Sequence, residues 1–372
     1  MSQIIPIEAI SPPLIVTGRG NGDTSPDGAI RREISYNAPK TTLIIKLEDS
    51  HKSGGSPLYD RNMPSARQLI EVITIMALEF AVLDVFTSEP FRGNPLAIVR
   101  VPPEVELSQA QKQAIAKEFN LSETVFLHQQ TETDVQNGDA RVDIFTPIAE
   151  LPFAGHPTVG TSNYLLHHLK LETARTLVAK AGRLPFQAQG DGVLLSVPHN
   201  VHIHAQPFSD RDFGHYPVVS IVKGMNFILA QLPDLEALAK PTENLLGTSN
   251  TYTAKERLDE GWRDGIVNTY YFVDLGTQED GTRNLRTRGL GSREDPATGS
   301  AASALSSYLT LSEGKGGPLT RSYHITQGVE MGRRGDIHVK VILEESRREI
   351  KEVFLGGEAV PTSEGKIQIP SL

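Results

Sequence analysis

The alternation of apolar and polar positions becomes regular near Leu78 and continues to the C-terminus. Runs in which every second residue is apolar, bounded by glycine, proline or asparagine, are typical of half-buried strands. The chain is therefore expected to contain many short strands. They are predicted over residues 80–86, 96–101, 124–128, 141–145, 218–222, 270–273 and 337–343.

A helix is predicted after the first two strands. Ser108 and Gln111 have the spacing of a capping box, in which each residue bonds to the backbone N–H of the other, and the helix is expected to run through Phe119. The segment from Phe91 to Pro95 is rich in turn residues and is predicted to be a turn.

Two further helices are predicted, one in each half of the chain. The first is expected to begin at His156 or Pro157, since proline is favourable at the first helical position, and to run to about Leu169. Ser300 is expected to cap the second, in which apolar residues recur at helical spacing. Several strands per helix predict an α+β fold of two similar halves, each a curved, mostly antiparallel, barrel-like sheet around a central helix.

The same short motif precedes both of these helices. Glu150-Leu-Pro-Phe-Ala-Gly155 and Glu294-Asp-Pro-Ala-Thr-Gly299 both read E-x-P-x-x-G. A glycine turn that enters a helix presents free backbone N–H groups and the positive end of the helix dipole, which together favour an anion. The repeat therefore predicts a duplicated fold in which two helix N-termini face one small, negatively charged ligand.

Residues 1–75 differ from the rest because they are rich in glycine, serine and proline. They are expected to form a poorly ordered extension in which only residues 41–47 could make a strand. Met76 directly precedes the first patterned strand, which raises the hypothesis that translation starts there. The remainder is expected to divide into halves at 76–200 and 201–372, with the last strand able to return to the first half.

Composition excludes several classes of function. The 372 residues contain 38% hydrophobic and 22% charged side chains, as in a soluble globular protein, and the formal net charge of -9 argues against a nucleic-acid partner. The chain has no cysteine, which excludes disulfides, thiolate catalysis and cysteine metal sites. The most apolar stretch carries acidic residues and the N-terminus lacks a signal-peptide pattern, so no membrane partner and a cytoplasmic location are expected.

Glu123 and Asp295 are candidate acid–base residues. Glu123 lies between a predicted helix and strand among apolar neighbours, where a carboxylate can acquire a raised pKa. From spacing alone, a solvated or capping glutamate is the simpler interpretation. Asp295 precedes a helix N-terminus and could polarise a ligand, although a turn or capping role again explains it more simply.

His156 and Ser300 occupy matching positions after the two motif glycines. A histidine at a helix N-terminus tends to stay neutral, so His156 could donate or accept a hydrogen bond in a pocket, or could simply cap its helix. The Ser300 hydroxyl would face a ligand held between the helices, or act only as a cap. No P-loop, nucleophile elbow or dinucleotide-binding pattern is present, and no cluster of residues has convincing metal-ligand spacing.

Five motifs, in order, resemble the phenazine-biosynthesis PhzF-like isomerase family, from about Leu78 to the C-terminus. They are Asp84-Val-Phe-Thr-Ser-Glu-Pro-Phe-Arg-Gly-Asn-Pro-Leu-Ala, Asn120-Leu-Ser-Glu-Thr, Phe145-Thr-Pro-Ile-Ala-Glu-Leu-Pro-Phe-Ala-Gly-His-Pro-Thr, Glu294-Asp-Pro-Ala-Thr-Gly-Ser-Ala and Gln327-Gly-Val-Glu-Met-Gly-Arg. The resemblance implies a diaminopimelate-epimerase-like fold, a homodimer and no cofactor. Diaminopimelate epimerase uses two cysteines, so its thiol chemistry is not available to this chain.

The resemblance also implies roles for individual residues. The catalytic glutamate of the family falls on Glu123, and the supporting residues fall on His156, Asp295 and Ser300. The substrate carboxylate is expected near Gly155 and Pro157 of one helix start and Thr298 and Gly299 of the other. The implied reaction is a proton shift in a small, cyclic amino acid such as trans-2,3-dihydro-3-hydroxyanthranilate, which belongs to secondary metabolism.

Two positions depart from the family pattern and leave the substrate open. Asp143 lies where a basic residue is common, and Arg288 replaces an expected aromatic residue near the pocket. A non-catalytic binding protein that keeps the fold, as in the MAWD-binding-protein-like group, is a rival interpretation. A lyase or hydrolase that uses the same base is a third.

Overall fold

The computed structural model describes residues 17–19, 30–38, 41–49 and 77–371, with gaps at 211–213, 241–242, 248–257 and 314–316. The chain divides into two compact units, Met1–Leu69 and Ile70–Leu372. None of the helices within the described residues has the length and the apolar character needed to cross a membrane.

The first unit contains one small antiparallel sheet. Its strands are β1 (Thr17–Arg19), β2 (Ile30–Ala38) and β3 (Thr41–Asp49), with β2 at the centre. The strand predicted over 41–47 is therefore confirmed as part of β3. Most other residues of 1–75 lie outside the described residues, so the predicted disorder of this extension and the start at Met76 stay predictions.

The second unit begins with strands and helices that form the first half of the predicted duplication. These elements are β4 (Ala77–Val85), β5 (Asn94–Val101), α2 (Gln109–Phe119), β6 (Thr124–His128), α3 (Glu132–Asn137), β7 (Asp139–Phe145), β8 (Glu150–Leu151), α4 (Gly155–Asn163), the π-helix η1 (Tyr164–His168), β9 (Thr176–Ala179), β10 (Gly182–Gln189), β11 (Gly192–Ser196) and β12 (His202–Ile203).

After a short hairpin, the remaining elements repeat this order, except that α3 and η1 have no counterpart among the described residues. They are β13 (Phe208–Asp210), β14 (Gly214–Tyr216), β15 (Val218–Val222), β16 (Gly224–Gln231), α5 (Leu235–Leu238), β17 (Gly265–Thr277), β18 (Thr282–Leu290), β19 (Glu294–Asp295), α6 (Gly299–Ser312), β20 (Thr320–Gln327), β21 (Gly335–Leu343), β22 (Ile350–Gly357) and β23 (Ala359–Gln368).

Strand pairing is the same in the two halves. In the first, β4 pairs with β5 antiparallel, β5 with β6 parallel, β6 with β7 antiparallel and β7 with β9 parallel. In the second, β15, β16, β17, β18 and β20 repeat these four pairings in the same order and sense. The short strands β8 and β19, which begin the two E-x-P-x-x-G motifs, pair with β7 and β18 respectively.

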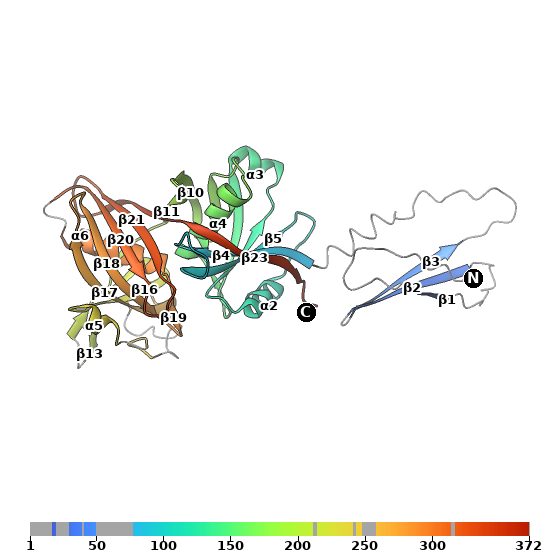
Figure 1. Cartoon of the computed structure of the whole chain (residues 1–372), viewed down its shortest axis with the longest axis horizontal. Helices are drawn as coiled ribbons and strands as arrows, with labels where there is room; N and C mark the ends of the chain where they lie inside the picture. The colour runs from blue at the N-terminus through green and yellow to red at the C-terminus, as the bar shows by residue number, and fades with distance from the viewer. Residues whose placement is uncertain are drawn as a thin grey trace. The chain divides into compact units, whose positions relative to one another are not determined.

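The two halves exchange their final strands. After the first half, β12 pairs with β15 of the second half, and after the second half, β23 returns to pair with β4 of the first. The pairing of β11 with β22 joins the two sheets directly. The strand exchange and this junction hold the two halves together, which Figure 1 shows as β23 running from the second sheet across to β4.

Each sheet curves around one central helix. Helix α4 contacts β4, β5, β6, β11, β22 and β23, whereas α6 contacts β15, β16, β20, β21 and β22 (Figure 1). Both helices are almost wholly buried and rich in small residues, which lets the strands approach closely. The predicted α+β fold of two halves, each with a curved and mostly antiparallel sheet around a helix, is confirmed.

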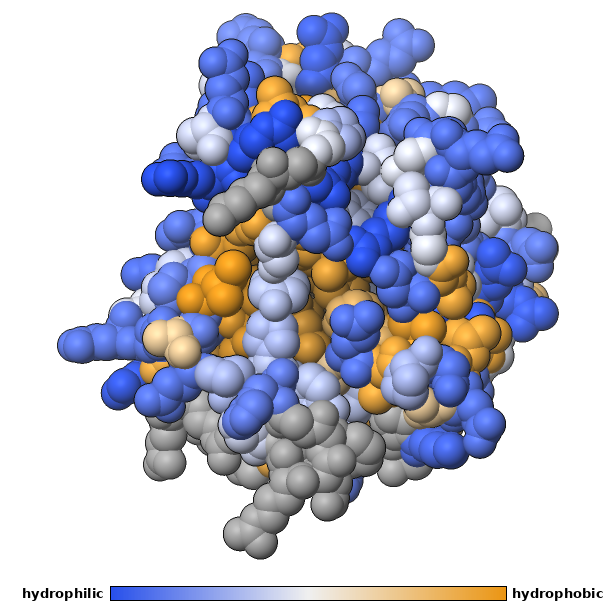
Figure 2. Space-filling view, turned by 90° about the vertical axis from the view of Figure 1, so that its left-hand side faces the viewer, coloured by the Kyte–Doolittle hydropathy of each residue, from blue (hydrophilic) through white to orange (hydrophobic). Residues whose placement is uncertain are grey.

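The outer face of each sheet is covered separately, because alternate strand residues point to opposite faces. In the first half, α2 packs on a cluster that includes Val99, Phe126 and Phe145. In the second half, α5 and the β13–β14 hairpin cover a cluster that includes Ile228 and Tyr271. Figure 2 looks onto the molecule from the side of the second half, where apolar side chains gather at the centre of the face between polar ones.

Three helix ends differ from the sequence predictions. All seven predicted strands are present, and the Ser108–Gln111 capping box forms as expected. However, α4 begins one residue earlier than predicted, at Gly155, and ends at Asn163, where the wider π-helix η1 follows. The prediction that Ser300 caps its helix is wrong, because the N-cap of α6 is Thr298 and Ser300 lies buried in the first turn.

Candidate active site

The N-termini of α4 and α6 meet backbone to backbone. A Cβ atom placed on Gly155 would lie 2.6 Å from the carbonyl carbon of Gly299, and one on Gly299 would lie 3.1 Å from the Cα of Gly155. Only glycine permits this approach. Since the first N–H groups of a helix have no acceptor within it, the two starts together form one region of positive potential.

A cavity of about 240 Å³ lies next to this junction, between the two halves. The first half contributes the loop that carries Glu123 and the turn after β7. The second half contributes β16, β17, the loop after β18 and the start of α6. The wall consists of Asn120, Ser122, Glu123, Thr146, Pro147, Ile148, Met225, Ile266, Asn268, Gly291, Ser292, Arg293, Asp295, Thr298 and Ser300.

Glu123 is not a solvated loop residue. Its side chain is only 15% exposed, and its Oε2 atom has no hydrogen-bond partner among the described residues. Burial and then the negative charge of Asp295 raise the pKa of Glu123 well above its usual value, whereas Arg293 opposes the shift. A carboxyl group with a raised pKa holds its proton more tightly than an exposed one and is suited to acid–base exchange with a ligand.

Asp295 lies in β19, where three side chains surround it. Thr298 Oγ1 donates to one carboxylate oxygen at 2.7 Å and Asn94 Nδ2 donates to the other at 2.7 Å. Burial raises the pKa of Asp295, and the hydrogen bonds from Thr298, Asn94 and Ser122 work in the opposite direction. Asp295 is therefore held in a fixed orientation at the cavity wall, and it does not cap α6.

Asn94 connects the candidate residues of the two halves. Its Nδ2 atom lies 2.7 Å from Asp295, 3.0 Å from the Ala297 carbonyl oxygen and 3.2 Å from His156 Nδ1. Its Oδ1 atom accepts a hydrogen bond from Ser122 at 3.1 Å. An amide nitrogen carries two hydrogens, and the two shorter contacts use both of them. His156 Nδ1 is then available to exchange a proton with another group.

That other group is Glu123. His156 Nδ1 lies 3.3 Å from Glu123 Oε2, and the imidazole is only 3% exposed. Burial lowers the pKa of His156 to about 3, although a hydrogen bond with the Pro95 backbone works against this shift. His156 is thus a neutral ring behind Glu123, as expected for a histidine at a helix N-terminus, and it can share one proton with the carboxyl group.

A second layer of hydrogen bonds fixes the start of α6. The amide of Gln327 donates to the Asp295 carbonyl oxygen at 2.7 Å and accepts from the Thr298 N–H at 3.0 Å. Tyr270, which is buried, donates to the same amide oxygen at 2.9 Å. These contacts hold the backbone of Asp295 and the start of α6 in place.

A partly buried ion pair fixes the turn that carries Asn94. Arg333 Nη2 lies 2.6 Å from Asp84 Oδ1, and Arg333 also donates to the backbone oxygens of Arg92 and Gly93. Asp84 in turn accepts from the N–H of Phe91 at 2.6 Å. Two of the five sequence motifs, which lie far apart in the chain, therefore meet to orient Asn94.

Some of the predicted site residues line the cavity and others do not. Glu123, Asp295, Thr298 and Ser300 line it, and His156 lies directly behind Glu123. Gly155 and Gly299 form the helix junction but are not part of the cavity wall, and Pro157 has no N–H group to offer. Binding of a substrate carboxylate by these helix starts stays a prediction.

Several residues at the site were not identified from the sequence. Asn94, Ser122, Arg293 and Gln327 all contact Asp295 or line the cavity. Asn94, Ser122 and Gln327 belong to three of the five recognised motifs, which was the available signal. No sequence pattern pointed to Arg293.

The two departures from the family pattern lie outside the cavity wall. Burial opposes ionisation of Asp143, yet hydrogen bonds from His128 and Lys112 lower its pKa to about 2. Arg288 is buried and makes a two-pronged ion pair with Glu294, at 2.8 and 2.9 Å. Both charges are thus neutralised by neighbours. Arg288 also orients Glu294, the first residue of the second E-x-P-x-x-G motif.

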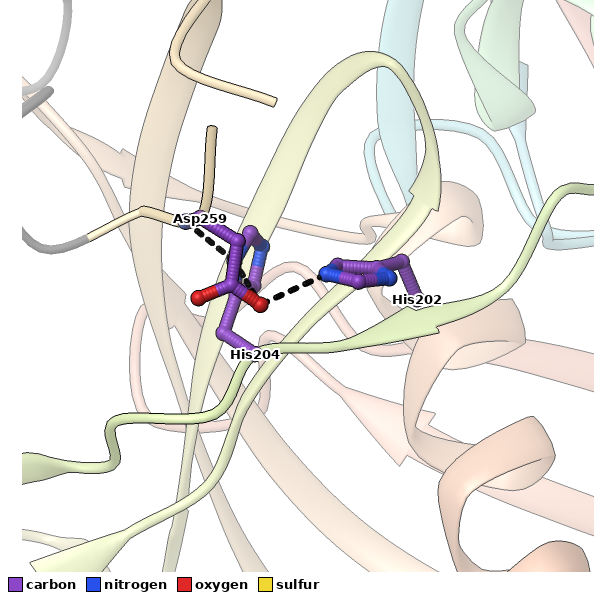
Figure 3. A group of neighbouring side chains, drawn as sticks. All are labelled: His202, His204 and Asp259. Carbon is purple, nitrogen blue, oxygen red and sulfur yellow. Dashed lines mark hydrogen bonds and ion pairs between the residues drawn. The ribbon is translucent and has the colours of Figure 1, made fainter. Parts of the chain in front are cut away.

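One further group of side chains has the composition of a metal site, namely His202, His204 and Asp259 (Figure 3). Hydrogen bonds within the protein already explain why these three side chains lie together. His202 Nε2 donates to Asp259 at 2.8 Å, and His204 Nδ1 accepts from the Asp259 N–H at 3.0 Å. Ser220 gives its own hydrogen to Asn226, so His204 Nε2 must donate to Ser220 at 2.9 Å. With both nitrogens of His204 in use, the group fastens residue 259 to β12.

Comparison with known proteins gives one consistent result. Residues 83–365 match a family model described as phenazine biosynthesis-like protein. A human protein named phenazine biosynthesis-like domain-containing protein is 32% identical over 259 residues, 64% of this chain and 86% of the human one. The Pseudomonas fluorescens trans-2,3-dihydro-3-hydroxyanthranilate isomerase is 29% identical over 309 residues, 77% of this chain and 98% of the relative.

A solved structure has the same fold. The PhzF-family phenazine biosynthesis protein of Bacillus anthracis superposes with a TM-score of 0.62 at 21% identity, covering 79% of this chain and 99% of the other. The resemblance inferred from the five motifs and the expected fold are both confirmed.

Proposed function

This chain belongs to the phenazine biosynthesis-like family, and from that premise we propose that it is an isomerase that moves a proton on a small, cyclic, carboxylate-bearing metabolite by glutamate acid–base chemistry. The proposal includes independence of any cofactor and a role in secondary metabolism. The observation that carries it is the environment of Glu123, a buried carboxyl group of raised pKa beside a neutral histidine and a cavity.

In the proposed reaction, Glu123 in its ionised form takes a proton from a substrate carbon. The electron pair left behind spreads over the conjugated system, and the protonated Glu123, whose proton exchanges with solvent, returns a proton to another carbon. His156 supports both states in this proposal, because Nδ1 of the neutral ring donates to the carboxylate in one tautomer and accepts from the carboxyl group in the other at the 3.3 Å contact. No group needs to be oxidised, reduced or released.

The remaining residues orient the substrate in this proposal. The free N–H groups at the starts of α4 and α6 hold the substrate carboxylate. Asp295, fixed by Asn94 and Thr298, accepts a hydrogen bond from a donor on the substrate, such as an amino group. Ser300 provides a hydroxyl group at the same wall of the cavity.

Heavy water provides the test. The wild-type protein and Glu123→Gln are incubated in D₂O with trans-2,3-dihydro-3-hydroxyanthranilate and, separately, with a metabolite extract of the organism that encodes the chain. A metabolite that gains deuterium only with the wild-type protein supports the proposal. Equal labelling with both proteins would contradict it, and binding without any labelling would favour a non-catalytic role.

A further inference from the structure

Arg293 contributes a positive charge to the wall of the cavity. It lies in the loop between β18 and β19, two residues before Asp295, and its side chain is exposed. Among the described residues that form the cavity wall, it is the single cationic side chain, and it faces a wall that contains two carboxyl groups, Glu123 and Asp295. A charge at this place acts directly on any anion that enters.

The loop that carries Arg293 is shaped to bring it to the cavity. The N–H of Gly291 donates to the Arg293 carbonyl oxygen at 3.0 Å, which closes a tight turn. A Cβ atom on Gly291 would lie 2.6 Å from Asn268 Oδ1, so glycine leaves room for Asn268 at the same wall. Asn268 Oδ1 has no hydrogen-bond partner among the described residues. The loop is therefore packed against a buried amide oxygen at the cavity wall.

Arg293 also reaches across the cavity to the first half. Its Nη1 atom donates to the backbone oxygen of Asn120 at 3.1 Å, at the start of the loop that leads to Glu123. This contact uses one of the five N–H donors of a guanidinium group. The other donors point from a rigid, planar group and suit the two oxygens of a carboxylate.

We infer that Arg293 binds a second acidic group of the substrate, so that the cavity takes small dicarboxylic acids in preference to monocarboxylic acids. The inference rests on the proposed function for the place of the first carboxylate, at the two helix starts. One carboxylate then lies at the helix junction and the other at the rim.

Calorimetric titration of the full chain tests the inference with two matched pairs of probes, benzoate with isophthalate and butyrate with glutarate. The wild-type protein is expected to bind the dicarboxylate of a pair more tightly. Arg293→Gln should weaken dicarboxylate binding about ten-fold or more, because charge-assisted hydrogen bonds are lost, and should change monocarboxylate binding little. Arg293→Lys should retain part of the preference.

Arg92→Gln is the matched control, because Arg92 is also exposed, also donates to a backbone oxygen of the other half, Gly332, and lies outside the cavity wall. It should leave both affinities unchanged. The inference is overturned if the wild type shows no preference, if neither acid of a pair binds, or if Arg293→Gln weakens both acids equally, as the loss of a purely structural contact would. Deuterium labelling that requires Glu123 but not Arg293 would leave the proposed function intact in each of these cases.

Discussion

Gly155 and Gly299 begin the two central helices and lie in direct backbone contact, although they are far apart in the sequence. A Cβ atom on Gly155 would come within 2.6 Å of both the Gly299 carbonyl carbon and the Ser300 nitrogen. Each glycine ends one copy of the repeated E-x-P-x-x-G motif. This contact gives a physical reason for the glycine in both copies of the motif, because the two helix starts can touch only where neither residue has a side chain.

Gly155→Ala is expected to destabilise the protein. The new methyl group would meet backbone atoms of α6 that cannot move without shifting the helix, and overpacking of this kind typically costs about 1–3 kcal/mol. The free energy of unfolding from denaturant titration measures the effect. Gly365→Ala is the control, since its Cβ would meet only the ring of Phe80 at 3.0 Å, and this partly exposed side chain can give way. Equal losses in the two variants would contradict the account.

His156 is expected to remain neutral across the physiological pH range. Burial lowers the pKa of His156 to about 3, so its ring should not take up a proton between pH 5 and pH 8. Nuclear magnetic resonance of the protein with labelled histidine measures this directly, with the signal assigned from its absence in His156→Asn. A ring signal that moves with a midpoint near pH 6 would show that the imidazole is charged beside Glu123, and the shared-proton contact would then be a salt bridge.

Glu123→Gln is expected to increase stability at neutral pH. The pKa of Glu123 is higher in the folded than in the unfolded state, so the folded protein binds the proton more tightly and loses stability as pH rises above the unfolded value near 4.5. Each unit of difference corresponds to about 1.4 kcal/mol at pH values above the folded pKa. The amide avoids this loss.

The advantage of Glu123→Gln over the wild type should therefore grow between pH 4 and pH 8, as measured by denaturant titration at each pH. Glu118→Gln, which changes an exposed residue of the preceding helix, is the control and should show no such growth. If the variant is less stable than the wild type at pH 8, the fold stabilises the Glu123 carboxylate. That result would contradict a raised pKa of Glu123.

Asn94→Ala is expected to slow the reaction by disturbing Asp295. Without the Asn94 amide, Asp295 loses a donor at 2.7 Å, its pKa rises further and its orientation loosens. The rate of deuterium labelling should fall about ten-fold or more, and the acidic limb of its pH profile should shift to higher pH. Ser122→Ala, which removes a hydroxyl group that bonds to Asn94 and lowers the pKa of Asp295 less than Asn94 does, should have a smaller effect in the same direction. A lower rate with an unchanged pH profile would indicate a structural role alone.

The strands and the first helix could be predicted because their signals are local. Alternation of apolar residues and the Ser108–Gln111 capping box involve neighbours in the sequence, and the structure contains all of them. The duplication was visible in the repeated motif. The end of α4 was misplaced because η1 continues the same helical pattern with a wider turn, and a π-helix has no distinct sequence signal.

The active-site network could not be predicted in the same way. Asn94 and Asp295 are 201 positions apart, and only the folded chain brings the amide to the carboxylate. Glu123 and His156 were selected through family motifs, whereas spacing alone favoured a solvated glutamate. Arg293 belongs to none of the motifs. Only the folded structure identifies it, by its position at a cavity with two carboxyl groups.

The central claim is that Glu123 carries the proton that is moved. The most direct measurement is the initial rate of deuterium incorporation from D₂O into the identified metabolite, compared between the wild type and Glu123→Gln at the same pH. Loss of a positioned acid–base group typically lowers such a rate about 10²- to 10⁴-fold, and the account predicts a fall of this size while the variant stays folded and still binds the metabolite. A folded Glu123→Gln protein that labels the metabolite at the wild-type rate would contradict it.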